Sequence, residues 1–414
     1  MVLHLDEIRV SRVVFEYAAR IGQEQDPGLL LSLIADMGRD LLGADRCSIW
    51  MVEPATGTLW TCVAHGVAPI RVQAGQGLVG ACAETNSNVL VNDALEDPRL
   101  SRGTDESTGY LTRSVLCMPL RNGSGRVIGV FQALNKEGGF DANDIHLLNL
   151  ACSYSASAIE TQALRKEAEQ AQLMLRELAI ARDVQERLFP AVLPDVAGIE
   201  YECLCLPAKF VGGDYYDVIP VPGGRTCVTL GDVSGKGIPA AVVMASVQAS
   251  IRVNMTRGAD SLSTAFTALN QTVYATTAPE RYTTLFAACF EPDGRRMTYL
   301  NAGQTAPMLL RNSGQVERLD ASGPPVGLLR NACFEEQSIE LATGDLLVVF
   351  SDGVSEANNP AEDIWNEEEL EQVVVSCAGL SARDAHQRIL RAVRSFADGA
   401  EPSDDITLAV YRPV

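Results

Sequence analysis

The chain has 414 residues, of which 47% are hydrophobic and 21% charged, a balance that is ordinary for a globular protein of about two to three domains. A formal net charge of −20 argues against nucleic acid and anionic membranes as partners. No apolar run approaches the roughly 18 residues that span a bilayer. The 11 cysteines are scattered without paired motifs. We therefore expect a cytoplasmic protein with reduced thiols.

The first part of the chain, residues 1–160, predicts one α+β domain. Apolar residues recur every three or four positions from Val10 to Gly43, which indicates two helices separated at Asp26-Pro27. The pattern then changes to short strands divided by turn residues, ending in a hairpin across Asn122–Gly125. A last helix is expected to begin near Asp141.

The layout of this domain and its local strings resemble a GAF domain, a small-molecule sensor found upstream of signalling enzymes. The resemblance is carried by Pro119-Leu120, Val127–Val130 and Asn135-Lys136. GAF domains that bind cyclic nucleotides often carry Asn-Lys, a phenylalanine and, after three more residues, Asp-Glu, but Ile145 stands here where the glutamate is expected. The motif therefore either contributes to a site for a cyclic nucleotide or another small ligand, or serves the fold. The candidate sensor residues are Asn135, Lys136, Phe140 and Asp144.

Residues 161–190 continue the helical pattern and predict a linker. An a/d seam of apolar residues favours a parallel dimer with a short coiled coil, whereas the alternative is a helix packed on its own domains. The seam consists of Leu164, Ala168, Ala171, Leu175 and Leu178. It gives way to a second stripe, Ile180, Val184 and Leu188, and Pro190 and Pro194 end the helix.

Residues 191–414 predict a third region of strands and paired helices. The predicted strands are Glu200–Leu206, Asp214–Ile219, Thr226–Asp232, Thr284–Phe290, Arg296–Asn301, Met308–Leu310, Val316–Leu319, Asp345–Phe350 and Ile406–Tyr411. The predicted helices are Ile238–Arg257, Ser261–Thr276, Glu367–Cys377 and Ala382–Asp398. Mostly antiparallel strands with helices in pairs indicate an α+β fold.

Four acidic turns in this region each adjoin an apolar strand, and they contain Asp214, Asp232, Asp352 and Asp404. A single aspartate beside glycine is common in turns. Four together suggest an oxygen-lined binuclear site, because carboxylates and open backbone carbonyls suit hard cations such as Mg²⁺ and Mn²⁺.

Four strings, in order, resemble the signature of the bacterial SpoIIE/RsbU-type serine/threonine phosphatases of the metal-dependent PPM superfamily. They are VGGDYYD, GDVSGKGIPAA, FSDGVSEA and DDITLAV, and the preceding A-x-x-x-Q-x-x-L-x-P pattern spans Ala181–Pro190. The resemblance implies an α-β-β-α sandwich that binds two Mn²⁺ or Mg²⁺ ions.

The resemblance also implies roles for individual residues. Asp232 would bridge the two ions, with the carbonyl of Val233 on one of them and Asp352 and Asp404 on the other. Asp214 would belong to the same catalytic cluster and hold a metal directly or through a coordinated water. Asp405 and Asp217 are adjacent acids, and Asp405 is counted among the metal ligands. No counterpart is identifiable for the phosphate-holding arginine or the histidine acid of eukaryotic relatives, and Lys236 is the candidate substitute for the arginine.

The implied function is a metal-dependent protein serine/threonine phosphatase. Its expected substrate is a phosphoserine on an anti-sigma-factor antagonist of the STAS fold, and its expected regulator is the GAF domain acting through a homodimeric linker. The alternative is a catalytically weak metal-binding scaffold that acts by protein interaction. A nuclease is disfavoured because a net charge of −20 leaves little basic surface for nucleic acid.

Overall fold

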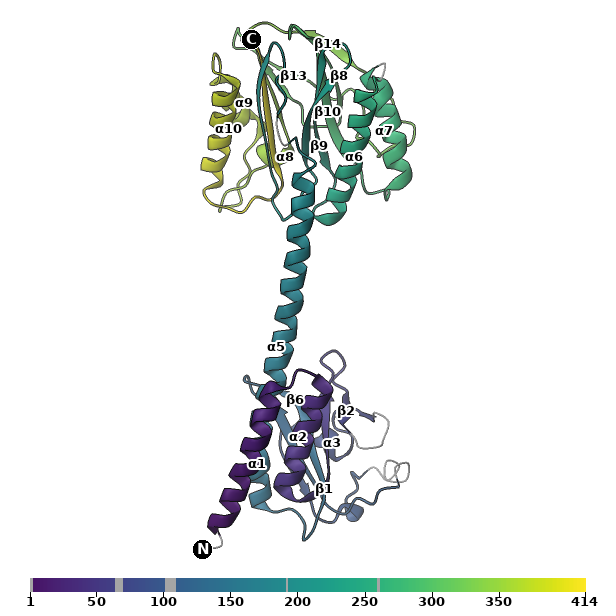
Figure 1. Ribbon diagram of the computed structural model, residues 1–414, viewed down its shortest axis with the longest axis vertical. Coiled ribbons are helices and arrows are strands. Elements are labelled where there is room, and N and C mark those ends of the chain that lie inside the picture. The colour runs from purple at the N-terminus through teal and green to yellow at the C-terminus, as the bar shows by residue number, and fades with distance from the viewer. Residues whose placement is uncertain (1–2, 64–69, 101–108, 191–192, 259–260) are drawn as a thin grey trace. The chain divides into compact units, whose positions relative to one another are not determined.

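The structure is a computed structural model that describes residues 3–63, 70–100, 109–190, 193–258 and 261–414 (Figure 1). The chain divides into two compact units, Met1–Gln172 and Leu173–Val414.

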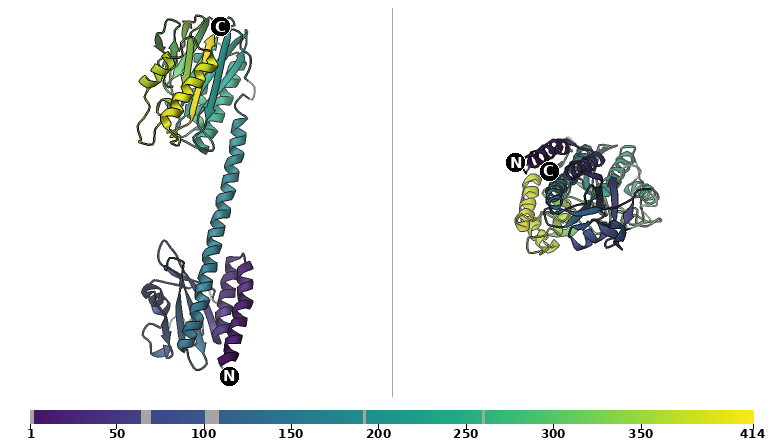
Figure 2. Two further views of the ribbon diagram at one scale, coloured as in Figure 1. Left: turned by 90° about the vertical axis from the view of Figure 1, so that its left-hand side faces the viewer. Right: turned by 90° about the horizontal axis from the view of Figure 1, so that it is seen from below.

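The first unit is built on a six-stranded antiparallel sheet with the strand order β3-β2-β1-β6-β5-β4. Its elements are α1 (Leu3–Gln23), α2 (Pro27–Leu42), β1 (Ala44–Val52), β2 (Leu59–Val63), β3 (Arg71–Val72), α3 (Gly77–Thr85), β4 (Val89–Val91), the 3₁₀ helix η1 (Ala94–Glu96), β5 (Val115–Arg121), β6 (Val127–Lys136) and the first part of α5 (Ala142–Glu186). Helices α1 and α2 lie side by side (Figure 2). They pack with α5 around a core in which Ile34, Phe131 and Leu148 are fully buried. This arrangement confirms the predicted α+β domain.

The predicted continuous helix is confirmed, because α5 extends without a break over 45 residues. It ends at Glu186, before the Pro190 that the sequence marks as a stop. Within the described residues, the seam side chains are left largely to solvent: Leu164 is 61% and Leu175 51% exposed, and only Leu178 is half-buried. Exposing such an apolar stripe to water is unfavourable for an isolated helix, because no other surface covers it.

The second unit is a sandwich of two five-stranded antiparallel sheets. Their strand orders are β14-β11-β10-β9-β8 and β13-β12-β15-β16-β7. The strands are β7 (Ile199–Leu206), β8 (Tyr215–Val221), β9 (Arg225–Val233), β10 (Thr283–Phe290), β11 (Arg296–Ala302), β12 (Met308–Leu310), β13 (Val316–Arg318), β14 (Gln337–Glu340), β15 (Leu346–Phe350) and β16 (Ile406–Pro413). The helices are α6 (Ile238–Thr256), α7 (Leu262–Thr276), α8 (Asp352–Ser355), α9 (Glu367–Val375) and α10 (Ala382–Ala397).

Three cores hold the sandwich together. Phe286, Leu347 and Tyr411 are buried between the two sheets. Helices α6 and α7 pack on the outer face of one sheet, and α9 and α10 pack on the outer face of the other (Figure 1). The expected α-β-β-α layering is therefore confirmed.

Among the described residues of the second unit, two elements lie outside the sequence prediction. Strand β14 is a four-residue edge strand whose side chains are mostly exposed, so no apolar alternation marks it. Helix α8 is one turn that begins at Asp352, where the sequence indicated only a turn.

Helix α6 is long and apolar enough, by length and composition, to span a membrane, with a mean hydropathy of 1.2 over its best window. Its buried face, which includes Met244, Val247 and Ile251, belongs to the core shared with α7 and the β8–β10 strands. Packing within the domain thus accounts for one face of α6, whereas Val242 and Val253 are 62% and 46% exposed.

Candidate functional site

The four predicted catalytic aspartates lie at the ends of strands from both sheets. Asp214 immediately precedes β8, and Asp232 is the penultimate residue of the neighbouring strand β9. In the other sheet, Asp352 opens α8 just after β15, and Asp404 lies just before β16, the strand paired with β15. A contact between the sheets joins the two pairs, because Thr407 Oγ1 of β16 donates a 2.6 Å hydrogen bond to Asp214 Oδ2.

Burial and the charges of the other carboxylates raise the pKa values of three of these aspartates. Burial raises the pKa of Asp232 to about 7, and the negative charges of Asp352 and Asp404 add to the effect. Burial and then the charge of Asp232 raise the pKa of Asp214 well above its usual range. The pKa of Asp352 is raised by burial and by the charge of Asp404. Such a cluster carries repulsion that a nearby cation would relieve.

Asp405 plays a different part from its neighbour Asp404. It is buried, and its Oδ1 accepts a 2.8 Å hydrogen bond from the Ala208 backbone N–H, while its Oδ2 accepts one of 2.7 Å from that of Gly213. A Cβ at Gly212 would lie 2.2 Å from Asp405 Oδ2, so the loop can approach this carboxylate only with glycine there. These contacts favour a role in holding the Asp214 loop, and the predicted role of Asp405 as a metal ligand stays a prediction.

Asp217 is fully buried in β8 and forms a two-pronged ion pair with Arg252 of α6. The distances are 2.9 Å from Arg252 Nε to Asp217 Oδ2 and 2.7 Å from Nη2 to Oδ1. This pairing ties α6 to the sheet and gives Asp217 a structural partner.

The chemistry of the donor set fits hard divalent cations, although the side chains do not already form a ligand shell. Among the residues that the structure describes, no group of three or more histidine, cysteine or acidic side chains is placed to hold one ion. Lys236 supplies positive charge next to one of these carboxylates. Its Nζ lies 2.8 Å from Asp404 Oδ2 and also donates to the Ser403 carbonyl. The carboxylate oxygens, whose charge Lys236 offsets only in part, are donors that suit Mg²⁺ or Mn²⁺.

Gln185, near the end of α5, is buried and contacts the Asp214 loop. The sequence marked this residue only by its place in the A-x-x-x-Q-x-x-L-x-P pattern and did not indicate its role. Its Nε2 donates a 2.7 Å hydrogen bond to the Gly212 carbonyl, and its Oε1 accepts one of 3.0 Å from the Gly212 N–H. The end of the linker helix is thereby fastened to the backbone two residues before Asp214.

Of the four candidate sensor residues, Lys136 and Asp144 contact each other, whereas Asn135 and Phe140 contact other parts of the first unit. Lys136 Nζ lies 2.7 Å from both carboxylate oxygens of Asp144, which is almost fully buried. Asn135 Oδ1 accepts from the backbone N–H of Arg113 and its Nδ2 donates to the Leu111 carbonyl, while Phe140 is buried in the core. These contacts favour a role in the fold, and ligand binding by these residues stays a prediction.

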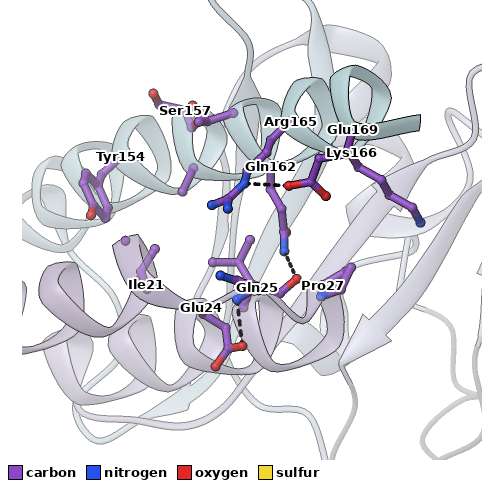
Figure 3. Close-up of a pocket in the computed structure, with 14 residues that line it drawn as sticks. Ile21, Glu24, Gln25, Pro27, Tyr154, Ser157, Gln162, Arg165, Lys166 and Glu169 are labelled. Carbon is purple, nitrogen blue, oxygen red and sulfur yellow. Dashed lines mark hydrogen bonds and ion pairs between the residues drawn. The ribbon is translucent and has the colours of Figure 1, made fainter. Parts of the chain in front are cut away.

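A pocket of about 510 Å³ lies elsewhere in the first unit, between the α1–α2 connection and α5 (Figure 3). None of the four candidate sensor residues lines it. Its lining side chains include Gln162, which donates to the Gln25 carbonyl at 2.6 Å, and the ion pair of Arg165 with Glu169 at 3.0 Å. Its polar groups are therefore partly engaged with one another.

Comparison with known proteins agrees with the two units. Residues 222–413 match the family Stage II sporulation protein E (SpoIIE), and residues 26–159 match the GAF domain family. The chain is 27% identical over 264 residues to Protein IcfG of Synechocystis sp., covering 57% of this chain but only 41% of that protein. It is 26% identical over 267 residues to Phosphoserine phosphatase RsbU of Bacillus subtilis, covering 64% of this chain and 78% of that protein.

Among solved structures, the SiaA-PP2C domain of Pseudomonas aeruginosa has a TM-score of 0.53 at 16% identity, covering 59% of this chain and 99% of that domain. At that identity the likeness concerns the fold alone. Along the chain, a region that matches the GAF domain family is thus followed by one that matches the SpoIIE family.

Proposed function

We propose that the chain is a metal-dependent protein serine/threonine phosphatase. The observation that carries the proposal is the cluster of Asp214, Asp232, Asp352 and Asp404 at the strand ends of both sheets, with the pKa values of the first three raised by burial and mutual repulsion. The family match over residues 222–413 supports the same activity.

In this proposal, two Mn²⁺ or Mg²⁺ ions would be held by Asp232, the Val233 carbonyl, Asp352 and Asp404, and Asp214 would complete the cluster. When bound, such ions neutralise the carboxylates and activate water for attack on phosphorus. Thr407 orients the Asp214 carboxylate through its 2.6 Å hydrogen bond. Asp405 holds the preceding loop in place through its two backbone hydrogen bonds.

We further propose that the substrate is a phosphoserine on an anti-sigma-factor antagonist of the STAS fold, in the cytoplasm. The similarity to a phosphoserine phosphatase named RsbU supports a protein substrate in a regulatory pathway. The net charge of −20 disfavours nucleic acid and anionic membranes as partners.

The test is dephosphorylation of candidate phosphoserine antagonist proteins, with p-nitrophenyl phosphate as a general substrate, in the presence of Mn²⁺ and after chelation. A phosphatase should release phosphate only with the metal. Metal binding without phosphate release from any of these substrates would favour the scaffold alternative.

The first unit is proposed to sense a small ligand, and a cyclic nucleotide is the specific prediction. If Asn135, Lys136, Phe140 and Asp144 contribute to such a site, cAMP or cGMP should bind the full chain and raise its melting temperature, because binding to the folded state stabilises it. Isothermal calorimetry and thermal unfolding would measure both effects. Lack of binding at millimolar nucleotide would leave these residues with the structural role that their contacts favour.

We also propose a homodimer formed through the GAF domain and the linker, supported by the exposed seam of α5. Replacing Leu175 and Leu178 together by serine should weaken the dimer by at least about ten-fold, since a short seam has few contacts to lose. Analytical ultracentrifugation would measure the dissociation constant. Serine at Leu173 and Met174, which are exposed apolar residues of the same helix outside the seam, is the matched control. A wild-type chain that is monomeric at micromolar concentration would contradict the proposal.

A further inference from the structure

Arg281, in the connection between α7 and β10, packs directly on the loop that joins β9 to α6. Its Nη1 donates a 2.6 Å hydrogen bond to the carbonyl of Ser234, the residue that follows Val233. A Cβ at Gly235 would lie 1.9 Å from the same nitrogen, and Gly235 has a φ of +90°, so glycine is required for this approach.

Ser234 is itself held from several directions by the segment that contains Arg281. Its N–H donates to the Tyr282 carbonyl at 2.9 Å, and its Oγ accepts from the Tyr282 N–H and donates to the Glu280 carbonyl, both at 3.0 Å. The guanidinium is therefore fixed relative to the backbone that carries Asp232 and Val233.

The charge of Arg281 has no acidic partner among the described residues. Arg252, Arg311 and Arg318 each pair with carboxylates. Arg281 is half-buried, and the Ser234 carbonyl is its one hydrogen-bond acceptor within the described parts of the chain. The remaining N–H groups of its guanidinium are thus available to an external anion, in a protein with 53 acidic and 33 basic residues.

Lys236, the candidate for phosphate binding from the sequence, is already engaged by Asp404 and the Ser403 carbonyl. A phosphate group that approaches four clustered carboxylates needs positive charge beyond what neutralises the cluster. A guanidinium meets that need well, because its fork of N–H donors matches two phosphate oxygens.

We infer that Arg281 binds the phosphate group of the substrate beside the acidic cluster. This inference rests on the proposed phosphatase function and adds a residue to its site. In this role Arg281 contacts the phosphate oxygens directly, while its Nη1 stays on the Ser234 carbonyl and keeps the side chain in place.

The test uses the full chain loaded with Mn²⁺ and inorganic phosphate as the probe. R281Q should weaken phosphate binding about 10- to 100-fold, as expected for lost hydrogen bonds to a charged group. R281K, which keeps the charge and one donor to Ser234, should lose less, about ten-fold, because it lacks the fork. R257Q removes the same charge at the exposed, opposite end of α6 and should leave phosphate affinity unchanged.

Two calorimetric titrations and one kinetic assay separate the outcomes. In the Arg281 variants, calorimetry should show a lower phosphate affinity and a wild-type Mn²⁺ affinity. The kinetic assay should show the inhibition constant for phosphate and the KM rising in parallel. The inference is overturned if both Arg281 variants bind phosphate as the wild type does, or if they lose Mn²⁺ binding, which would mean that Arg281 only supports the loop. A wild type that binds phosphate through Arg281 but hydrolyses no phosphoester would instead overturn the phosphatase function alone.

Discussion

Replacing Asp232 by asparagine is expected to lower phosphatase turnover by more than about 100-fold, since even residues that only orient metal ligands contribute 10- to 100-fold. Asparagine keeps the size of the side chain but removes the negative charge that would help to hold the cations. Asp352→Asn should have a similar effect, because its carboxylate lies in the same repulsive cluster. Turnover of a phosphoserine substrate at saturating Mn²⁺ is the measurement.

The Asp232 variant should remain folded. The metal-free wild type has a carboxylate at this position whose charge is disfavoured by burial and by two neighbouring acids. The melting temperature of the metal-free variant should therefore be no lower than that of the wild type, whereas calorimetry should show weaker Mn²⁺ binding. Asp398→Asn makes the same chemical change at an exposed position with a φ of +43°, which asparagine tolerates, and serves as the control. Near-normal turnover of the Asp232 and Asp352 variants would refute the metal mechanism.

The second large effect is expected from changing the length of α5. An insertion of four residues after Glu169 turns the following helix by about 40° relative to the preceding seam, whereas seven residues nearly restore the phase. If the linker transmits the state of the GAF domain by rotation or register, the four-residue insertion should lock activity high or low. The seven-residue insertion should largely keep both the basal activity and the response.

The hydrogen bonds of Gln185 connect the end of α5 to the loop before Asp214, which is where a rotation of α5 would act. A turn of α5 would move Gln185 against Gly212, and Gly212 is two residues from Asp214. Gln185→Ala should therefore make activity insensitive to both insertions, while Arg187→Ala, an exposed residue of the segment that follows α5, is the matched control. Steady-state kinetics of the insertion variants, with and without Gln185→Ala, tests this. Unchanged basal activity and sensor response in both insertions would remove the linker from the regulatory path.

The local elements of this protein could be predicted because their signals are local. The apolar runs of β9 and β15, the break at Asp26-Pro27 and the uninterrupted helical pattern of α5 each lie within one short window of sequence. Hydrophobic periodicity reports such elements directly. The exposed edge strand β14 was missed because its stability comes from pairing with β11 and not from its own side chains.

The roles of the individual polar residues were decided only by the tertiary structure. Asp405 and Asp217 look alike in sequence, yet one holds the loop before β8 and the other pairs with Arg252. The contact of Asp405 with Gly213 joins residues 192 positions apart, and that of Gln185 with Gly212 joins the linker to the site loop. Such contacts depend on the order and alignment of strands in two sheets. The sequence by itself therefore determined which carboxylates could form a cluster, and the folded sandwich decided which neighbours each of them has.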